Sequence, residues 1–303
     1  MSYAIETVAL SKDYGDFLAV DQVDMHIPER EIYGFIGRNG AGKTTLIRML
    51  MGLAAPTEGE LYLFGENDKK AVENLRHSIG TIIEAPTFYG KMTGRENLEL
   101  HRRLLGLSPE SVDEALEFVD GEDFAEKPAG TLSMGQRQRM GLARAIMGKP
   151  KMLILDEPTN GVDPEGIVHL RKKLEILCNE YGTTILVSSH ILSELSQIAT
   201  WYGIIDHGVL LEEFSATELD NGEQAEIFTT DAQRLYEFLE TDYPGMKPLQ
   251  ESPNSVKIAI LREYMPNLTR KLVEENFPIF EIRWHKETIE DRFIKITQRG
   301  GQL

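Results

Sequence analysis

The sequence contains little that suits an oxidising compartment or a membrane interior. Only one of its 303 residues is a cysteine, Cys178, so no disulfide can form within the chain. No apolar run approaches the roughly 20 residues that a membrane helix needs, and the first residues show no basic stretch followed by an apolar one. These absences predict a cytoplasmic protein with no signal peptide and no direct membrane insertion.

Positive charge is also scarce. The chain has 32 Lys and Arg residues against 49 Asp and Glu residues, which gives a formal net charge of −17. Proteins that hold nucleic acid or an anionic lipid leaflet over a broad surface need clustered basic residues. The balance therefore argues against nucleic acid as a partner and against electrostatic adsorption to a membrane. Hydrophobic residues make up 41 % of the chain, which is enough for a packed core.

The hydrophobic pattern predicts an α/β protein of two domains, 1–219 and 220–303. Loose alternation in the first 30 residues predicts short antiparallel strands, and later apolar runs that alternate with helical segments predict a parallel, doubly wound sheet. The remainder predicts a small α+β accessory domain. Its expected strands lie at 224–229, on both sides of 253–254 and at 279–285, and its expected helices at 231–240, at 263–275 and at the end of the chain.

A glycine-rich segment, Gly37-Arg-Asn-Gly-Ala-Gly-Lys-Thr44, fits the pattern G-x-x-x-x-G-K-[ST] between a predicted strand and a predicted helix. Its glycines let consecutive backbone N–H groups converge on phosphate oxygens, and the helix N-terminus adds its positive dipole. Lys43 is expected to reach the β- and γ-phosphates, and Thr44 to hold Mg²⁺. The predicted binding residues are Gly37, Arg38, Asn39, Gly40, Ala41, Gly42, Lys43, Thr44 and Thr45.

Two other predicted strands end in polar residues. The run Met152–Leu155 leads into Asp156 and Glu157, and desolvated carboxylates are costly unless a metal ion or a donor satisfies them. Asp156 fits a Mg²⁺-holding role, and Glu157 fits the group that polarises an attacking water. The run Thr184–Val187 leads similarly to His190. Because parallel strands end at one edge of the sheet, His190 is expected to donate to the γ-phosphate or the attacking water.

The segment Leu132-Ser-Met-Gly-Gln136 predicts the start of another helix, since Ser133 and Gln136 have the spacing of a capping box. Ser133, the N–H of Gly135 and the helix dipole together predict a second anion site. A chain with two phosphate-binding helix starts requires a specific explanation.

Together these motifs resemble the ATP-binding cassette subunits of membrane transporters, over about residues 3–219. The resemblance implies a P-loop NTPase cassette with a mixed central sheet, an antiparallel β subdomain and a helical signature subdomain. It also implies ATP hydrolysis by a homodimer or pseudo-dimer arranged head to tail, in which the signature of one subunit closes over ATP bound by Lys43 of the other. The signature residues are Leu132, Ser133, Met134, Gly135 and Gln136.

The same resemblance implies further roles. Tyr14 matches the aromatic residue that stacks on adenine, followed by Val20. Asn160 and Asp163 match the loop that crosses the dimer interface, and His190 matches the switch histidine. The implied partner is a separate membrane permease, which would place the chain on the inner face of the cell membrane.

Glu84 departs from the family pattern, which usually has Gln where the strand near residues 81–83 ends. This variant, the Asn160 loop and the segment Thr288–Phe293 resemble the subgroup linked to bacitracin resistance and lantibiotic immunity. The subgroup implies export of a peptide antibiotic or a similar amphipathic compound. Glu84 can contact Mg²⁺ and join the catalytic groups, but its negative charge beside the γ-phosphate puts the usual role of the amide in doubt.

Other functions remain alternatives at this point. An importer ATPase would have the same motifs. Soluble cassette ATPases of DNA repair or translation carry two cassettes or a long insertion, and a non-hydrolysing regulatory module is expected to lack Glu157 or His190. The surface around Glu84, Pro86 and the aromatic pair Phe88 and Tyr89 is expected to receive a short helix of the permease, unless the aromatic pair is local core.

Overall fold

The computed structural model describes residues 2–220, 224–285 and 288–300. The chain divides into two compact units. One comprises the residues up to Phe214 together with those from Arg299 onward, and the other spans Ser215–Gln298. The boundary predicted at residues 219 and 220 lies within the short helix α9 (Ala216–Asp220). We describe each unit by itself.

The first unit begins with a small antiparallel sheet built around β1 (Tyr3–Asp13). This strand pairs with β2 (Leu18–Val23), β3 (His26–Pro28) and β5 (Glu58–Leu63), all antiparallel. The antiparallel strands predicted for the first 30 residues are therefore confirmed. Their inward side chains pack with helix α1 (Lys43–Leu50) in the main core of the unit.

A second sheet carries the polar strand ends that the sequence singled out. Its order is β10-β9-β4-β8-β7-β6, and the pairs β9–β4, β4–β8, β8–β7 and β7–β6 are parallel. Every residue of β4, β7 and β8 is buried, which explains why these strands read as continuous apolar runs. The bounds of the strands are β4 Ile32–Ile36, β6 Ile79–Ile82, β7 Met152–Asp156, β8 Thr184–Ser189, β9 Trp201–Asp206 and β10 Val209–Ser215.

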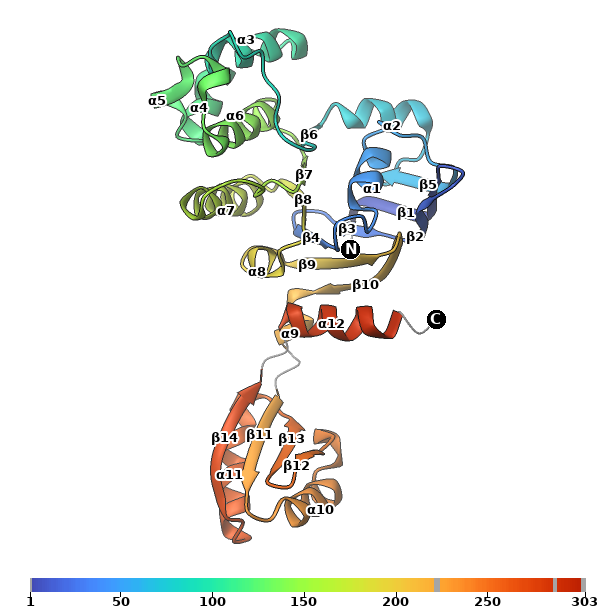
Figure 1. Ribbon diagram of the computed structural model, residues 1–303, viewed down its shortest axis with the longest axis vertical. Helices are drawn as coiled ribbons and strands as arrows, with labels where there is room; N and C mark the ends of the chain where they lie inside the picture. Colours follow the sequence, from blue (N-terminus) through green and yellow to red (C-terminus); the bar gives the residue numbers. More distant parts are fainter. Residues whose placement is uncertain (1, 221–223, 286–287, 301–303) are drawn as a thin grey trace. The chain divides into compact units, whose positions relative to one another are not determined.

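Helices form the rest of this unit. Figure 1 shows α3–α6 gathered beyond the β6 edge, away from α1. Thr93 caps α3 and Ser133 caps α6, each through a capping box with a residue three positions later. The helices are α2 Lys69–Arg76, α3 Gly94–Leu105, α4 Glu110–Phe118, α5 Glu122–Ala125, α6 Met134–Ile146, α7 Pro164–Asn179 and α8 Leu192–Leu195, with a 3₁₀ turn, η1, at Ala129–Thr131.

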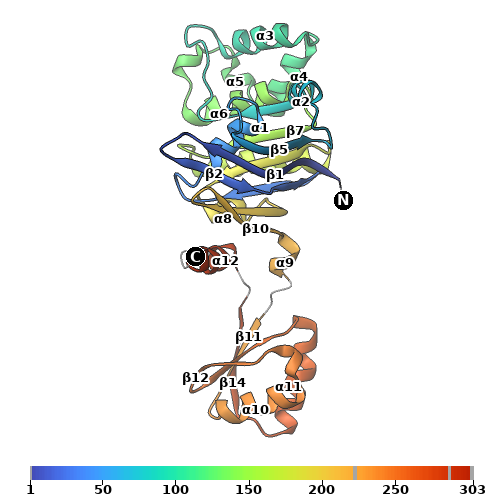
Figure 2. The ribbon, with the colours of Figure 1, turned by 90° about the vertical axis from the view of Figure 1, so that its right-hand side faces the viewer.

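The second unit is a four-stranded antiparallel sheet with the order β12-β13-β11-β14. Helices α10 and α11 lie on one face of this sheet (Figure 2), and their Leu235, Leu239 and Leu272 pack against Ile227 and Ile258 of the strands. The elements are β11 Gln224–Thr229, α10 Ala232–Asp242, η2 Pro244–Met246, β12 Leu249–Ser252, β13 Ser255–Ala259, η3 Arg262–Tyr264, α11 Met265–Glu274, β14 Ile279–His285 and α12 Ile289–Gly300.

Both the α/β class of the first unit and the strand and helix order of the second agree with the sequence prediction. None of the helices in the described part of the chain combines the length and the apolar composition that spanning a bilayer requires.

Candidate active site

The glycine-rich loop connects β4 to α1 and is held tightly against the core. A Cβ atom on Gly37 would lie 2.6 Å from the carbonyl oxygen of Ile205, and one on Gly42 would lie 2.6 Å from that of Ala19. Gly42 also precedes the first residue of α1 with a φ of 107°, in the left-handed region that favours glycine. The loop conformation therefore needs glycine at these positions, and it ends at a helix N-terminus suited to phosphate.

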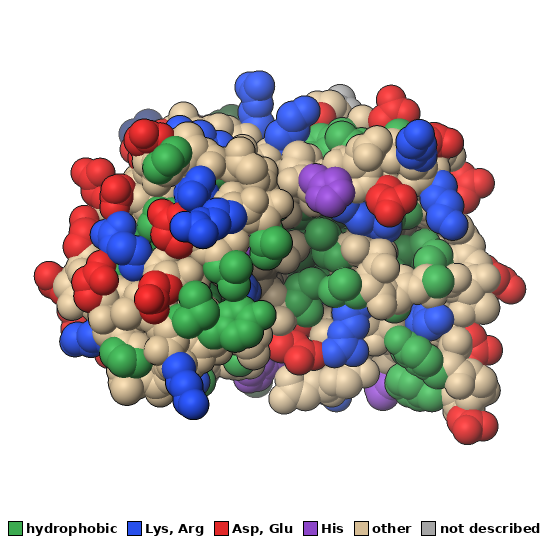
Figure 3. Space-filling view, turned by 90° about the horizontal axis from the view of Figure 1, so that it is seen from above, with side chains coloured by type: hydrophobic (Ala, Val, Ile, Leu, Met, Phe, Trp, Pro, Cys, Tyr) green, Lys and Arg blue, Asp and Glu red, His purple; other side chains and the backbone are tan. Residues whose placement is uncertain are grey.

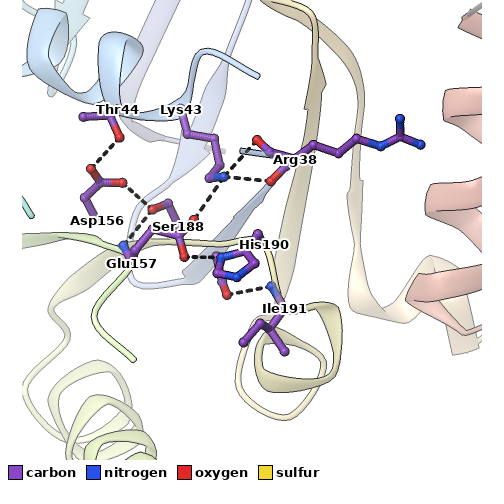
Figure 4. Close-up of polar contacts among 10 residues, drawn as sticks. Arg38, Lys43, Thr44, Asp156, Glu157, Ser188, His190 and Ile191 are labelled. Atoms are coloured by element: carbon purple, nitrogen blue, oxygen red, sulfur yellow. Dashed lines mark hydrogen bonds and ion pairs between the residues drawn. The ribbon is translucent and has the colours of Figure 1, made fainter. Parts of the chain in front are cut away.

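Lys43, the first residue of α1, reaches back over this loop (Figure 4). Its side chain is buried, and Nζ donates to the carbonyl oxygens of Gly37 at 2.7 Å and Arg38 at 3.3 Å. The same ammonium group forms an ion pair with Oε1 of Glu157 at 3.0 Å. Lys43 is thus held over the loop by the residue that was predicted to act on water.

Asp156, at the end of β7, is 2 % exposed. Its Oδ2 accepts a hydrogen bond from the Thr44 hydroxyl at 2.8 Å, and its Oδ1 accepts one from the Ser188 hydroxyl at 2.6 Å. The two hydroxyl groups satisfy a carboxylate that would otherwise be costly to bury. Thr44 and Asp156, predicted to hold the metal, are therefore direct neighbours.

Glu157 contacts residues at and just after the end of β8 as well as Lys43. Its Oε2 lies 2.7 Å from Nδ1 of His190, and its backbone N–H donates to the Ser188 hydroxyl at 2.9 Å. Its φ of 50° is left-handed, so the backbone turns sharply where β7 ends. The structure thereby brings together the predicted Lys43, Glu157 and His190 in one connected network (Figure 4).

Glu84 lies outside this network. Its side chain is exposed and forms an ion pair with Arg48 of α1, and its φ of 61° is also left-handed. The helix that starts with Lys43 and Thr44 is in this way connected to the loop after β6. The segment Thr87–Tyr89 follows, where Phe88 is half-buried beneath the Arg144 guanidinium and Tyr89 is 65 % exposed. Tyr89 is therefore not local core.

The predicted signature, Leu132–Gln136, is a helix start as expected. The Ser133 hydroxyl accepts from the Gln136 N–H, and the Gln136 side chain accepts from the Ser133 N–H. Gly135 faces the loop before α7, because a Cβ on it would lie 3.6 Å from Oδ1 of Asp163. Asp163 itself caps α7. This helix start belongs to the α3–α6 group and lies apart from α1 within the chain (Figure 1).

Tyr14 and Val20 have different environments. Tyr14 is 56 % exposed at the turn between β1 and β2, with the Lys12 ammonium 4.9 Å from its ring centre. The ring is therefore largely exposed, with the Lys12 ammonium over one of its faces. Val20 is fully buried in the main core, so it can support a nucleotide site only through the backbone that it positions.

Two residues of the site were not anticipated. Ser188 contacts both Asp156 and Glu157, and Arg48 pairs with Glu84. The sequence could have indicated Ser188 through its position between a buried strand and His190. Arg48 carried no signal, because a basic residue near the end of a helix is common.

Mg²⁺ fits the donors that the site provides. This ion takes oxygen ligands and is usually held by one or two carboxylates together with substrate phosphates. Thr44 and Asp156 supply such oxygens beside the glycine-rich loop. Across the described residues there is no cluster of three or more His, Cys, Asp or Glu side chains that would hold a metal alone. The donor set therefore suits a metal ion that arrives with phosphate.

Comparison with known proteins gives one consistent family. The sequence pattern of the ABC transporter family matches residues 20–160. The chain is 40 % identical over 304 residues to the bacitracin transport ATP-binding protein BcrA of Enterococcus faecalis, covering 99 % of this chain and 98 % of the relative. It is 38 % identical to the lantibiotic transport ATP-binding protein SrtF of Streptococcus pyogenes, covering 69 % of this chain and 90 % of that protein.

A solved structure supports the same assignment. A dimeric ATP-binding cassette in a post-hydrolysis state, bound to ADP and Pi, matches with a TM-score of 0.63 and 25 % identity, covering 70 % of this chain and 98 % of that one. This confirms the predicted fold class. With the glycine-rich loop, the paired carboxylates and the signature helix in place, the chain belongs to the ATP-binding proteins of ABC transporters and is an ATPase.

Proposed function

We propose that this chain is the ATPase subunit of an exporter for a peptide antibiotic or a similar amphipathic compound. The observation that carries the proposal is the 40 % identity to a bacitracin transport ATP-binding protein over 99 % of this chain. A match of that extent includes the second unit as well as the cassette. It favours a shared transport role over a general likeness between ATPases.

In the proposed reaction the backbone N–H groups of residues 37–45 and the Lys43 ammonium bind the phosphates of ATP. The bonds from Lys43 to Gly37, Arg38 and Glu157 keep the ammonium over the loop, ready to exchange these oxygens for phosphate oxygens. Tyr14 offers its exposed ring to the adenine. These groups position the nucleotide without using the overall charge of the chain, which is strongly negative.

Glu157 is proposed to orient and polarise the attacking water, with His190 fixing its carboxylate through the 2.7 Å contact. Thr44 and Asp156 would hold Mg²⁺, and the bound ion would supply positive charge to the phosphate oxygens. Glu84 is proposed as a further contributor at the metal, and the Arg48 ion pair offsets its charge.

The active unit is proposed to be a head-to-tail dimer. The capped helix start at Ser133 and Gly135 is proposed as a second anion site, and it lies apart from α1 in the same chain (Figure 1). A second subunit resolves this arrangement, because each signature can then close over the nucleotide held by the other Lys43. Asp163, which lies close to Gly135, and Asn160 of the same loop are proposed to contact the partner.

The membrane permease is proposed to bind next to the loop that contains Glu84. Tyr89, Leu100 and Leu104 are exposed and line a groove of about 440 Å³ together with Phe88. Exposed aromatic residues beside such a hollow are typical of binding sites for other proteins. Through this contact the chain would be held at the inner face of the cell membrane.

Two variants test the catalytic roles. Lys43→Ala is expected to lose nucleotide affinity, and Glu157→Gln is expected to bind ATP while hydrolysis falls by about 10²-fold or more, as for loss of a general base. Nucleotide titration and steady-state phosphate release measure the two effects. Full affinity in the first variant, or an unchanged hydrolysis rate in the second, would contradict the assigned roles.

The export role is tested in cells. Deleting the gene is expected to raise sensitivity to bacitracin or to a lantibiotic, and the intact gene, but not the Glu157→Gln form, should restore resistance. Unchanged sensitivity together with the loss of uptake of a nutrient would show that the chain serves an importer instead.

A further inference from the structure

A pocket of about 510 Å³ lies between helix α4 and the segments where α6 and α7 end. Its apolar walls include Ala115 and Phe118 of α4, Ile146 of α6 and Leu177 of α7, with Tyr181 just beyond α7. No residue to which we assign a role in ATP hydrolysis or permease binding is among the described residues that line it. A hollow of this volume, mostly apolar with a few polar groups, is typical of sites for small molecules.

Aromatic contacts hold one wall of the pocket. The rings of Phe118 and Tyr181 meet edge to face, with their centres 6.2 Å apart, and the Lys173 ammonium lies 5.3 Å from the centre of the Phe118 ring. Tyr181 is 66 % exposed, so its ring offers apolar surface to a molecule that enters the pocket. Such a wall favours a ligand with a flat or aromatic body.

The hydroxyl groups of the lining are available as hydrogen-bond acceptors. Ser111 and Thr183 are both buried. The Ser111 hydroxyl donates to the carbonyl oxygen of Ser108 at 2.7 Å, and the Thr183 hydroxyl donates to that of Pro150 at 3.5 Å. A hydroxyl that has donated its hydrogen keeps an oxygen that can accept. The lining therefore suits a ligand that brings hydrogen-bond donors.

The charges of the lining have the same preference. Lys149 is the one basic residue among the described residues that line the pocket, and its ammonium pairs with Glu114 at 2.8 Å, which raises the pKa of Lys149. Glu117 also lines the pocket, and no ion pair joins it to another of the described residues. One carboxylate is thus left without a counter-ion, in a chain whose net charge is already −17. Both the local and the overall charge favour a cation.

We infer that this pocket binds a small amphipathic cation, a molecule with an apolar or aromatic body and one ammonium group. The body packs between α4 and the end of α7. The ammonium forms charge-assisted hydrogen bonds with the Glu117 carboxylate and with a hydroxyl oxygen of the lining. An anion is disfavoured, because the ammonium of Lys149 already pairs with Glu114.

The position of the pocket connects such a ligand to the signature. Helix α6 begins next to Ser133 and α7 is capped by Asp163, and the starts of the two helices lie together at Gly135 and Asp163. The pocket contacts the opposite ends of the same two helices. Because helices are stiff, a ligand held between these ends acts on the spacing of the starts. This effect on hydrolysis rests on the proposed head-to-tail dimer, whereas binding does not.

The test uses the full chain and three probes that share an indole ring: tryptamine, its alcohol tryptophol, and the anion indoleacetate. Equilibrium dialysis measures each affinity at physiological ionic strength. Tryptamine is expected to bind about tenfold tighter than tryptophol, and indoleacetate to bind most weakly.

Two variants on α4 test the charge. Glu117→Gln keeps the shape of the side chain and removes its charge, so the affinity for tryptamine should fall to within about twofold of that for tryptophol. The matched control is Glu110→Gln, which removes the same charge from an exposed residue of α4 outside the lining. This control should keep the preference for tryptamine.

A third variant and a second measurement locate the probe. Tyr181→Ala removes part of the aromatic wall, so it should weaken tryptamine and tryptophol alike, by about fivefold. Tryptamine should also slow backbone hydrogen exchange in segments 111–118, 146–150 and 177–183, which form the pocket.

The molecule offers a competing apolar surface. Figure 3 shows hydrophobic side chains around a hollow with basic side chains close by, and the groove of Phe88 and Tyr89 is lined by Arg144 and by no carboxylate among the described residues. That groove should therefore prefer indoleacetate. Protection by tryptamine at this groove, and not at the pocket, would overturn the inference.

The remaining outcomes separate the proposals. If tryptamine binds no tighter than tryptophol, or if Glu117→Gln keeps the preference, this inference is overturned and the proposed export function is untouched. If binding is as expected, saturating tryptamine should change the rate of ATP hydrolysis by the wild type about twofold or more, and change that of Glu117→Gln less at the same concentration. An unchanged rate in the wild type would overturn the connection to the signature.

Discussion

Arg48 and Glu84 form an ion pair that joins the nucleotide-binding helix to the loop after β6. Arg48 lies in the last turn of α1, which begins with Lys43, and Glu84 follows the end of β6. Both side chains are partly exposed. The guanidinium offsets the negative charge that distinguishes Glu84 from the amide that the family usually has at this position.

This relationship predicts coupled effects in a double-mutant cycle. Arg48→Gln is expected to lower the rate of ATP hydrolysis about two- to fivefold, because an exposed pair is worth roughly 0.2–1 kcal/mol and Glu84 is left uncompensated. Adding Glu84→Gln should recover most of the loss. Steady-state phosphate release from the four proteins measures the coupling, and losses that simply add would show that the two side chains act independently.

Ser188 is predicted to hold the Asp156 carboxylate and the backbone of Glu157 in place. Ser188→Ala leaves Oδ1 of Asp156 and the N–H of Glu157 without the hydroxyl that each contacts. We expect a loss of about 1–3 kcal/mol in the free energy of unfolding, together with slower hydrolysis. Urea denaturation and phosphate release measure the two effects.

The adjacent Ser189→Ala is the matched control. Its hydroxyl accepts a hydrogen bond from the backbone N–H of Ile191, and no hydrogen bond among the described residues joins it to either carboxylate. Ser189→Ala should lower the free energy of unfolding less than Ser188→Ala does, and it should leave the rate of ATP hydrolysis nearly unchanged. Equal effects of the two substitutions would mean that Ser188 contributes only packing.

The sequence was sufficient to place Lys43, Asp156, Glu157 and His190 at one site. Each follows a buried parallel strand or begins the helix after one, and parallel strands end at a common edge whatever their order in the sheet. The helix start at Ser133 was placed by a different signal, the capping-box spacing of Ser133 and Gln136. Local spacing also sufficed for the second unit, where alternating apolar residues mark its strands.

The partners of these residues depend on register and could not be predicted. Asp156 stands opposite Ser188 because β7 and β8 pair with Leu155 beside Val187. A shift of this strand register by one residue would place Ser189 opposite Asp156 instead. The left-handed backbone of Glu84 and Glu157 also departs from the local preference of glutamate, and it arises from the tertiary structure.

Glycines of the phosphate loop are predicted to differ in their tolerance of alanine. Gly40→Ala adds a Cβ with nothing within 4 Å at a φ of 83°, so only backbone strain of about 1–2 kcal/mol is expected. Gly42→Ala adds similar strain and a 2.6 Å approach to the Ala19 carbonyl oxygen, so it should destabilise the chain further. Thermal unfolding without nucleotide separates stability from binding. Equal melting temperatures would contradict the loop geometry.

Cys178 gives a prediction about alkaline pH. Burial raises the pKa of the Cys178 thiol to about 11, and the thiol donates to the carbonyl oxygen of Arg30 at 3.3 Å. At pH 8 the native thiol is therefore neutral, and it should react with a disulfide reagent far more slowly than in urea. The native rate should rise with pH up to about 11.

The same shift affects stability, with a sign that follows from proton binding. Between the ordinary thiol pKa of 9.0 and about 11, the unfolded chain loses this proton and the folded chain keeps it. Stability must then fall with rising pH, by up to about 1.4 kcal/mol per unit from this group. Urea unfolding of the wild type and of Cys178→Ala between pH 8 and 10.5 isolates the contribution. If the two proteins show the same slope in this range, the thiol is not protected by burial.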